Sequence, residues 1–186
     1  MYLHVTVEQV PRQTSLGAGL DRVLEMMDRV IEEARLTVQG LRHPEAETLD
    51  LESFFRRISE HANWDSRASL KVEVKGPQRK LRPAVSEEVA RLGSEAITNS
   101  VRHAKATLIQ VTLRFSKPAF VLEIADDGIG IEARILTAGR EGHFGLAGMR
   151  ERAERLNARL HITSTLGQGT WVQVQLPAKF AYQSGQ

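Results

Sequence analysis

Cysteine is absent from the 186 residues, so neither a disulfide framework nor a metal site with thiolate ligands can form. No apolar run approaches the roughly 18 residues that a membrane span needs, and no signal-peptide pattern is present. No run of about five or more Lys or Arg residues occurs, and the net charge is only +2, so nucleic acid is not an expected partner. These absences suit a cytoplasmic chain without direct membrane contact.

Three common enzyme signatures are also missing. No G-x-G-x-x-G follows a strand and opens a helix, and no G-x-x-x-x-G-K-[ST] phosphate loop occurs. No pair of histidines has the spacing of a metal site either. Four scattered histidines are predicted to be structural or solvent-facing: His4, His43, His61 and His161. A Rossmann dinucleotide site and a P-loop are therefore excluded.

The residues that are present include 41% hydrophobic ones, enough for one domain with an appendage. The first pattern is an a/d heptad seam, whose positions are Leu20, Leu24, Met27, Ile31, Ala34, Val38 and Leu41. It predicts a long helix that ends before Pro44 and belongs to a helical hairpin or dimer bundle, or alternatively packs on its own domain. Residues 1–10 resemble the end of an earlier helix, which makes residues 1–44 a partial helical region.

After Pro44 the patterns change to a helix over 49–63 with Asp50 as N-cap, a strand over 69–76 and a long helix over 83–104 with Ser86 as a candidate cap. The remaining predictions are strands at 107–116, 119–127, 159–167 and 169–177 and a helix near 146–157. We expect an α+β fold, a two-layer sandwich with a mixed, mostly antiparallel sheet and helices on one face. The catalytic-type domain would span 45–180 with a tail at 181–186, and the end of the chain, residues 178–186, is expected to be frayed.

Six glycines fall between Gly128 and Gly148, around two of the three clusters that carry chemistry. In "ADDGIG" a strand ends in carboxylates, which can accept a hydrogen bond from an exocyclic amine, while glycines let a flat ring approach the backbone. A simple hairpin turn is the alternative. In "GHFGLAGMRERAERL" glycines stand where a helix begins, and its unpaired N–H groups suit a phosphate. A flexible loop before a surface helix is the alternative.

The third cluster is "EAITNSVRHA", in which Glu95 and Asn99 share one helix face. The Asn99 amide oxygen suits a hard cation such as magnesium, which takes few protein ligands besides phosphate oxygens. Arg102 and His103 follow one turn further on, and Arg102 and Lys105 can neutralise phosphate charge. Taken alone, the same spacing would describe a half-exposed helix with solvated polar residues.

Together the clusters resemble the ATP-binding superfamily of gyrase B-type topoisomerases, heat-shock ATPases of the ninety-kilodalton class, mismatch-repair ATPases and histidine kinases. "EAITNSVRHAKA" is similar to the N box, "DDGIG" to the first glycine box, "GHFGLAGM" to the second and "GQGT" to the third. "GLAGMRERAERL" and "VIEEARLTVQGLR" resemble the nitrate-sensor-like branch of sensor histidine kinases. The likeness covers roughly residues 20–177.

The resemblance implies a role for each matching position. Asp126 would bind the adenine amine, with Gly128 and Gly130 allowing the base to pack. Asn99 would hold Mg²⁺, and Glu95 would orient a water or act as a base. Phosphates would be contacted by Arg102 and His103 and by the backbone N–H groups of the glycine-rich helix start, while the first strand residue after "GQG" would support the pocket; these residues are Gly145, Leu146, Ala147, Gly148 and Thr170. Asp127 stands where that family often has Asn.

The expected function is thus the catalytic region of a two-component sensor histidine kinase, with ATP and Mg²⁺ as cofactors. Its partners would be a response regulator and a second copy, joined through the helical region, in the cytoplasm or in the cytoplasmic portion of a membrane-anchored sensor. The branch's phosphoacceptor motif is missing, and His4 lacks its flanking basic run, so the acceptor histidine is expected outside these residues. A non-transferring ATP-binding regulator and a conformational ATPase are the alternatives.

Overall fold

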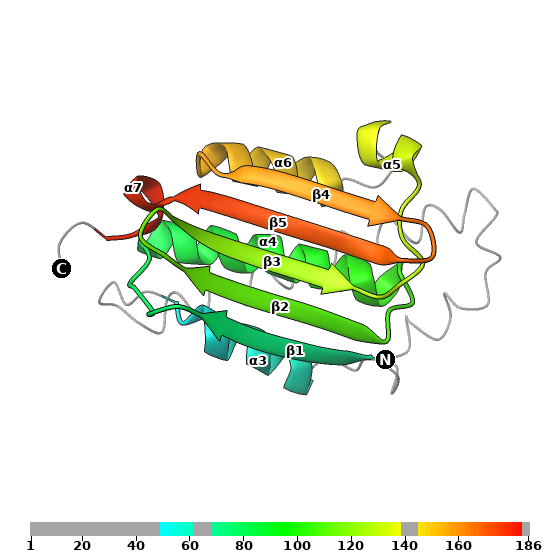
Figure 1. The fold of residues 1–186 in the computed structure, drawn as a ribbon, viewed down its shortest axis with the longest axis horizontal. Helices are drawn as coiled ribbons and strands as arrows, with labels where there is room; N and C mark the ends of the chain where they lie inside the picture. The colour runs from blue at the N-terminus through cyan, green and yellow to red at the C-terminus, as the bar shows by residue number, and fades with distance from the viewer. Residues whose placement is uncertain (1–48, 62–67, 139–144, 184–186) are drawn as a thin grey trace, which may run out of the picture. The chain divides into compact units, whose positions relative to one another are not determined.

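A five-stranded sheet stands at the centre of the computed structural model, which describes residues 49–61, 68–138 and 145–183 (Figure 1). The strands are β1 (Ser69–Lys75), β2 (Leu108–Phe115), β3 (Ala119–Asp126), β4 (Arg159–Thr165) and β5 (Gly169–Pro177). Their order across the sheet is β1-β2-β3-β5-β4. The β1–β2 pair is parallel and the other three pairs are antiparallel, so the predicted mixed, mostly antiparallel sheet is confirmed.

Three helices cover one face of this sheet (Figure 1). They are α3 (Leu51–His61), α4 (Pro83–Arg102) and α6 (Gly145–Arg155), which contact β1, β3 and β4 respectively. Two shorter helices, α5 (Ala133–Ala138) and α7 (Ala178–Ala181), were not predicted. The α+β class with helices on one face is confirmed, whereas the heptad-patterned helix and His4 lie outside the described residues. No helix in the described ranges is long and apolar enough to cross a bilayer.

The core lies between the sheet and α4, because alternate strand residues point toward the helices. Val111 and Leu122 are fully buried from the sheet side, and Val89 and Leu92 are fully buried from α4. Burying each such side chain contributes about 1.5–3 kcal/mol relative to leaving it exposed. Val101, near the end of α4, is only half-buried.

Helix α4 begins one turn earlier than a Ser86 cap would require. Pro83 occupies the start of the helix, and Arg82 is the N-cap residue in an extended conformation without a side-chain cap. Ser86 is fully buried, and its hydroxyl donates to the Pro83 carbonyl at 2.8 Å. The predicted Ser86 cap was therefore wrong, because a proline already has the φ angle of a first helical residue and lacks the N–H that a cap would satisfy.

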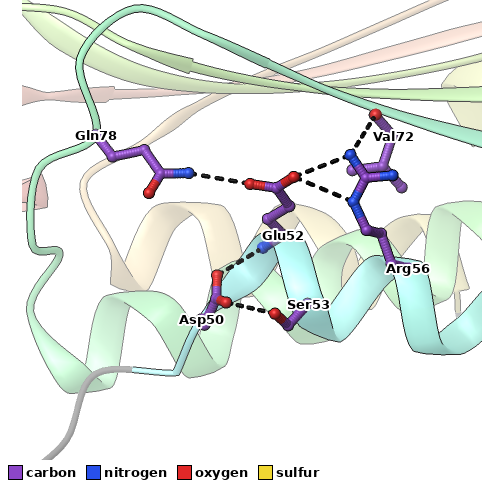
Figure 2. A network of polar contacts seen from close by, with 6 residues as sticks. All are labelled: Asp50, Glu52, Ser53, Arg56, Val72 and Gln78. Atoms are coloured by element: carbon purple, nitrogen blue, oxygen red, sulfur yellow. Dashed lines mark hydrogen bonds and ion pairs between the residues drawn. The ribbon is translucent and has the colours of Figure 1, made fainter.

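Helix α3 is fixed at its start and along its side by polar contacts (Figure 2). Asp50 accepts a hydrogen bond from the Glu52 backbone N–H at 3.1 Å, which confirms Asp50 as the N-cap. The Glu52 carboxylate in turn accepts from Arg56 at 2.9 Å and from Gln78 at 3.1 Å, so one side chain joins α3 to the loop after β1. Arg56 also reaches the Val72 carbonyl of β1 at 3.4 Å.

The end of the chain is ordered where fraying was predicted. Helix α7 follows β5 directly, and the Tyr182 side chain is only 4% exposed. Its hydroxyl accepts from the Ser116 N–H and donates to the Ala119 carbonyl, both at 3.1 Å. The Arg79 guanidinium lies 3.7 Å from the centre of its ring. The prediction of a frayed tail was wrong as far as Tyr182, because this aromatic side chain completes the core beside the β2–β3 hairpin.

Candidate functional site

The predicted site residues gather at one end of the sheet, on the right in Figure 1. Strand β3 ends there at Asp126, which pairs in register with Thr170 near the start of β5. The last turns of α4, which carry Asn99, lie at the same end, and α6 begins there at Gly145. Residues that lie far apart in the sequence therefore meet because strand and helix ends share one edge of the two layers.

The Asp126 carboxylate is held by three donors from three elements. Its Oδ1 accepts from the backbone N–H of Gly128 at 2.9 Å and of Thr170 at 3.2 Å. Its Oδ2 accepts from the Ser100 hydroxyl of α4 at 2.8 Å. A carboxylate offers about four lone-pair sites, so these contacts fix its plane and leave one site on Oδ2 for a ligand donor.

Ser100 was not among the predicted site residues. It is only 4% exposed and lies on the face of α4 that packs against the sheet. The signal was present in the sequence, because Ser100 stands among apolar positions of the helical period, where a hydroxyl needs a partner. That partner is the carboxylate at the end of β3.

The two glycines of "DDGIG" lie directly against backbone atoms of neighbouring segments, not beside an open space. A Cβ on Gly128 would overlap the carbonyl oxygen of Ala104 and lie 2.9 Å from its carbonyl carbon. Gly130 has a φ of +74°, and a Cβ there would lie 2.8 Å from the carbonyl carbon of Thr165. These positions allow the loop to pass between the end of α4 and the β4–β5 turn, a reason different from the predicted one.

Asp127 points away from Asp126 and joins β3 to the start of β2. Its Oδ1 accepts from the backbone N–H groups of Thr107 at 2.7 Å and Leu108 at 2.9 Å, and its Oδ2 accepts from the Thr107 hydroxyl at 2.6 Å. These hydrogen bonds, the Thr107 hydroxyl first, hold the pKa of the exposed Asp127 carboxyl below its ordinary value. Its role is therefore to fix the loop that presents Asp126.

We expect Asp127→Ala to lower the melting temperature by about 3 °C at pH 7. Because the folded-state pKa is depressed, this stabilisation is complete above the ordinary pKa of 3.8 and is lost as the pH falls through the folded value. Thermal unfolding followed by circular dichroism between pH 7 and pH 3 would show the gap to wild type closing in acid. Asp127→Asn, which keeps an acceptor without the charge, is the control. A gap that stayed constant with pH would contradict the role of the charge.

Glu95 and Asn99 share one face of α4, as predicted, and this face meets the start of α6. The Asn99 Nδ2 donates to Glu95 Oε1 over a long 3.4 Å. A Cβ on Gly145 would overlap that same oxygen and lie 3.6 Å from Asn99 Nδ2. Because glycine begins α6, the first turn of this helix can approach the two polar side chains of α4.

The first turn of α6 consists of Gly145, Leu146, Ala147 and Gly148. The N–H groups of a first helical turn lack partners within the helix and carry partial positive charge. A Cβ on Gly148 would meet nothing within 4 Å, so the helix is open on that side among the described residues. The turn is therefore able to receive an anion beside Asn99.

Two basic residue types, Arg102 and His103, stand at the end of α4 at the same edge. Both are exposed, and the backbone N–H of His103 donates to the Asn99 backbone carbonyl at 2.9 Å, which ends the helix. Lys105, also exposed, follows with a φ of +53°. The positive charges of Arg102 and Lys105 add to the partial positive charge of the α6 start. In the described ranges, no three His, Cys, Asp or Glu side chains come close enough to hold a metal, so a cation here would rely on ligands such as the Asn99 amide and on a bound anion.

Comparison with known proteins agrees with this arrangement. The family model of "Histidine kinase-, DNA gyrase B-, and HSP90-like ATPase" matches residues 84–179, about half of the chain. The chain is 31% identical over 166 residues to a sensor protein NarQ homolog of Haemophilus influenzae, covering 89% of the chain and 27% of that protein. It is 27% identical over 168 residues to the sensor protein VraS of Staphylococcus saprophyticus, covering 89% and 48%. The chain thus spans half or less of these relatives.

A solved structure supports the fold. The histidine kinase domain of the Erythrobacter litoralis EL346 blue-light activated histidine kinase aligns with a TM-score of 0.62 and 22% identity, covering 95% of this chain and 91% of that one. The matched family segment contains α4 and β3 with Glu95, Asn99 and Asp126, and it also includes the starts of α6 and β5. The chain belongs to the family of histidine kinase-, DNA gyrase B- and HSP90-like ATPases.

Proposed function

We propose that this chain contains the ATP-binding catalytic region of a two-component sensor histidine kinase, which passes the γ-phosphoryl group of Mg-ATP to a histidine that is not among those of this sequence. The main support is the fixed Asp126 carboxylate, which stands at the same end of the sheet as the start of α6. The first suits a purine amine and the second suits phosphates. An adenosine triphosphate carries both the purine amine and the phosphates.

Asp126 would receive the exocyclic amine of adenine. Its Oδ1 is already occupied by the N–H groups of Gly128 and Thr170, and Oδ2 keeps one acceptor site beside Ser100. The hydrogen-bonded carboxylate cannot turn away without breaking three contacts. The base would therefore meet an acceptor that is already oriented, which lowers the entropic cost of binding.

The phosphates would lie along the first turn of α6, near Arg102 and His103, with Arg102 adding positive charge. Asn99 fits a role as Mg²⁺ ligand, because its Nδ2 is turned toward Glu95 and its Oδ1 is left as the acceptor. The bound ion would neutralise charge on the phosphate oxygens. Glu95, close to Asn99 and Gly145, would orient a water or act as a base. Phosphoryl transfer depends mainly on such positioning and charge stabilisation.

In the whole protein the acceptor histidine would belong to a helical region that also forms a homodimer, with residues 20–41 as part of it. A response regulator would then receive the phosphoryl group, in the cytoplasm. Support comes from the similar proteins, which include sensor proteins and the signal transduction histidine-protein kinase/phosphatase DegS of Bacillus subtilis. The predicted domain limits, 1–44 and 45–180, remain part of this proposal.

The test is an Asn99→Ala variant made both in this chain and in the full-length parent. Mg-ATP affinity should fall about tenfold, equivalent to about 1.4 kcal/mol, and should no longer respond to Mg²⁺. Titration calorimetry with and without Mg²⁺ measures this, with Gln110→Ala, an exposed amide on β2, as the control. In the parent, label from γ-labelled ATP should appear on histidine and disappear in Asn99→Ala.

Three outcomes would overturn the proposal. ATP turnover without any phosphoprotein would favour a conformational ATPase, and ATP binding without turnover or transfer would favour a non-transferring regulator. A wild-type chain that does not bind ATP would exclude the proposed kinase function and both alternatives. This chain alone is expected to bind ATP without labelling itself, and labelling abolished by His4→Ala would contradict the assignment of the acceptor elsewhere.

A further inference from the structure

Helices α4 and α6 meet at two carboxylates of α4 that lie one heptad apart. At the site end, a Cβ on Gly145 would overlap Glu95 Oε1. Toward the other end of the contact, Arg152 Nη1 lies 3.6 Å from Glu88 Oε2. From 88 to 95 on α4 and from 145 to 152 on α6 the interval is the same, about two helical turns. The two helices therefore run antiparallel, with an ion pair about two turns from the first turn of α6.

The carboxylate of Glu88 is largely withdrawn from water. Its side chain is 21% exposed, and Arg91 Nη1 of the same helix lies 3.5 Å from its Oε1. The other oxygen, Oε2, is buried and has no hydrogen-bond partner among the described residues. A buried carboxylate oxygen is costly unless an opposite charge compensates it, and for Oε2 that charge is Arg152. The pair therefore favours the arrangement in which α6 keeps Arg152 opposite Glu88.

The apolar contacts of α6 determine its position only weakly. Met149 and Ala153 are the buried residues of this 11-residue helix. An alanine fills little volume, and a methionine adapts its flexible side chain to different surroundings. Arg150 also joins α6 to the Leu136 carbonyl, but α5, which contains Leu136, has only 6 residues. A charged contact with the 20-residue helix α4 is thus the firmer reference for the placement of α6.

The far end of α6 is tied to the sheet and acts as a pivot. The helix ends at Arg155, and β4 begins at Arg159 after a short turn. Measured from residue 156, Arg152 is about 6 Å away along the helix and Gly145 about 16 Å, at about 1.5 Å per residue. A swing that moves Arg152 by a given amount therefore moves the first turn of α6 roughly threefold further. Loss of the ion pair would be felt most where the phosphates are expected.

We propose that Glu88 is a positioning residue for the triphosphate: its ion pair with Arg152 fixes the angle at which α6 lies on α4 and so holds the first-turn N–H groups of α6 beside Asn99. This inference rests on the proposed nucleotide function and adds a determinant of phosphate binding that does not itself touch the nucleotide. Two simpler roles are distinguishable from it. Arg152 alone would favour the last turn of α6 through the helix dipole, and the charge of Glu88 alone would repel an anion.

Glu88→Gln separates these roles, because it keeps the shape of the side chain, leaves Arg152 in place and removes one negative charge. Charge alone predicts tighter binding of ATP, whereas a positioning role predicts weaker binding. We expect ATP to bind about fivefold more weakly and adenosine, which has no phosphate, to bind as in the wild type. Titration calorimetry measures ATP directly and adenosine by its competition with ATP.

Glu52→Gln is the matched control. It removes the same charge and also breaks an ion pair with an arginine, that of Glu52 with Arg56, but this pair lies within α3. Both affinities should stay at their wild-type values.

Two changes at Arg152 test the pair from the other helix, and they serve as the test if Glu88→Gln does not fold. Arg152→Gln should weaken ATP binding to a similar extent, and its combination with Glu88→Gln should be no weaker than either single variant, because the pair is lost only once. Arg152→Lys keeps the positive charge and should bind ATP within about twofold of the wild type. Additive losses in the double variant would contradict the pairing.

Hydrogen exchange of the nucleotide-free chain examines the same contact without ATP. The amides of residues 149–155 should exchange about fivefold faster in Glu88→Gln and at the wild-type rate in Arg152→Lys. Unchanged or tighter ATP binding in Glu88→Gln would overturn the inference, as would equal weakening of ATP and adenosine. In either case ATP binding by the wild type would leave the proposed function standing. Absence of ATP binding in the wild type would instead overturn both proposals.

Discussion

Asp126→Asn is expected to weaken ATP binding about a hundredfold while leaving the chain folded. In the wild type, the remaining acceptor site on Oδ2 suits an amine. In the variant, the amide oxygen would stay with the N–H groups of Gly128 and Thr170, so the amide nitrogen takes the place of Oδ2. A donor would then face the donor of adenine. Charge and hydrogen bond are lost together.

The fold should tolerate this change because Ser100 has a second acceptor. The Ala96 carbonyl lies 3.1 Å from its Oγ, so the hydroxyl can turn to that carbonyl and accept from the new amide nitrogen. Titration calorimetry measures the loss, and unfolding in urea checks the fold. Glu123→Gln, which removes a carboxylate charge from the outer face of the same strand, is the control. Near-normal ATP affinity in Asp126→Asn would exclude Asp126 as the base-recognising group.

Strand parity explains why Asp126, and not its neighbour, takes this position. Leu122 and Ile124 are buried on the helix-facing side of β3, so the next residue of the same parity, Asp126, also faces the helices. Asp127 has the opposite parity and reaches the start of β2 instead. The apolar pattern of the strand thus predicts the side to which each carboxylate points. Two adjacent acidic residues acquire different roles through alternation alone.

The long elements were predictable because each repeats its pattern over several periods. Strands β2 and β3 and the 20-residue helix α4 show their periods clearly, and their burial follows. Helices α5 and α7 contain only 6 and 4 residues, too few to show a helical period. Their positions depend on tertiary contacts instead, such as that between Tyr182 and Ser116.

The sequence indicated which segments come together, but neither Ser100 nor the internal contacts of the site, and the roles of the site residues stay predictions. Asn99, Asp126 and Gly145 meet at one edge, as the resemblance implied. The partners of Gly128 and Gly130 are backbone atoms of Ala104 and Thr165, which local sequence does not identify. Such contacts depend on how the loops pass one another. Only the three-dimensional arrangement reveals them.

Gly169→Ala is expected to lower the free energy of unfolding by about 4 kcal/mol, among the larger effects of a single substitution. Gly169 has a φ of +84°, where a non-glycine residue costs about 1–2 kcal/mol. A Cβ there would also overlap the carbonyl oxygen of Asp126 and lie 2.7 Å from its carbonyl carbon, both backbone atoms that β3–β5 pairing holds in place. Strand β5 would have to separate from β3 where Thr170 pairs with Asp126.

Two other glycines separate the cost of the positive φ from the cost of the steric overlap. Gly167, in the same turn, has a φ of +77° but nothing within 4 Å of an added Cβ, so Gly167→Ala should cost only about 1–2 kcal/mol. Gly148 lies inside α6 and also has nothing within 4 Å of an added Cβ, so Gly148→Ala should raise the free energy of unfolding by about 0.5–1 kcal/mol. Urea unfolding of the three variants measures the series. A loss at Gly169 no larger than at Gly167 would mean that β5 can move away from Asp126 at little cost, and the carboxylate would then lack the rigid support on which base recognition depends.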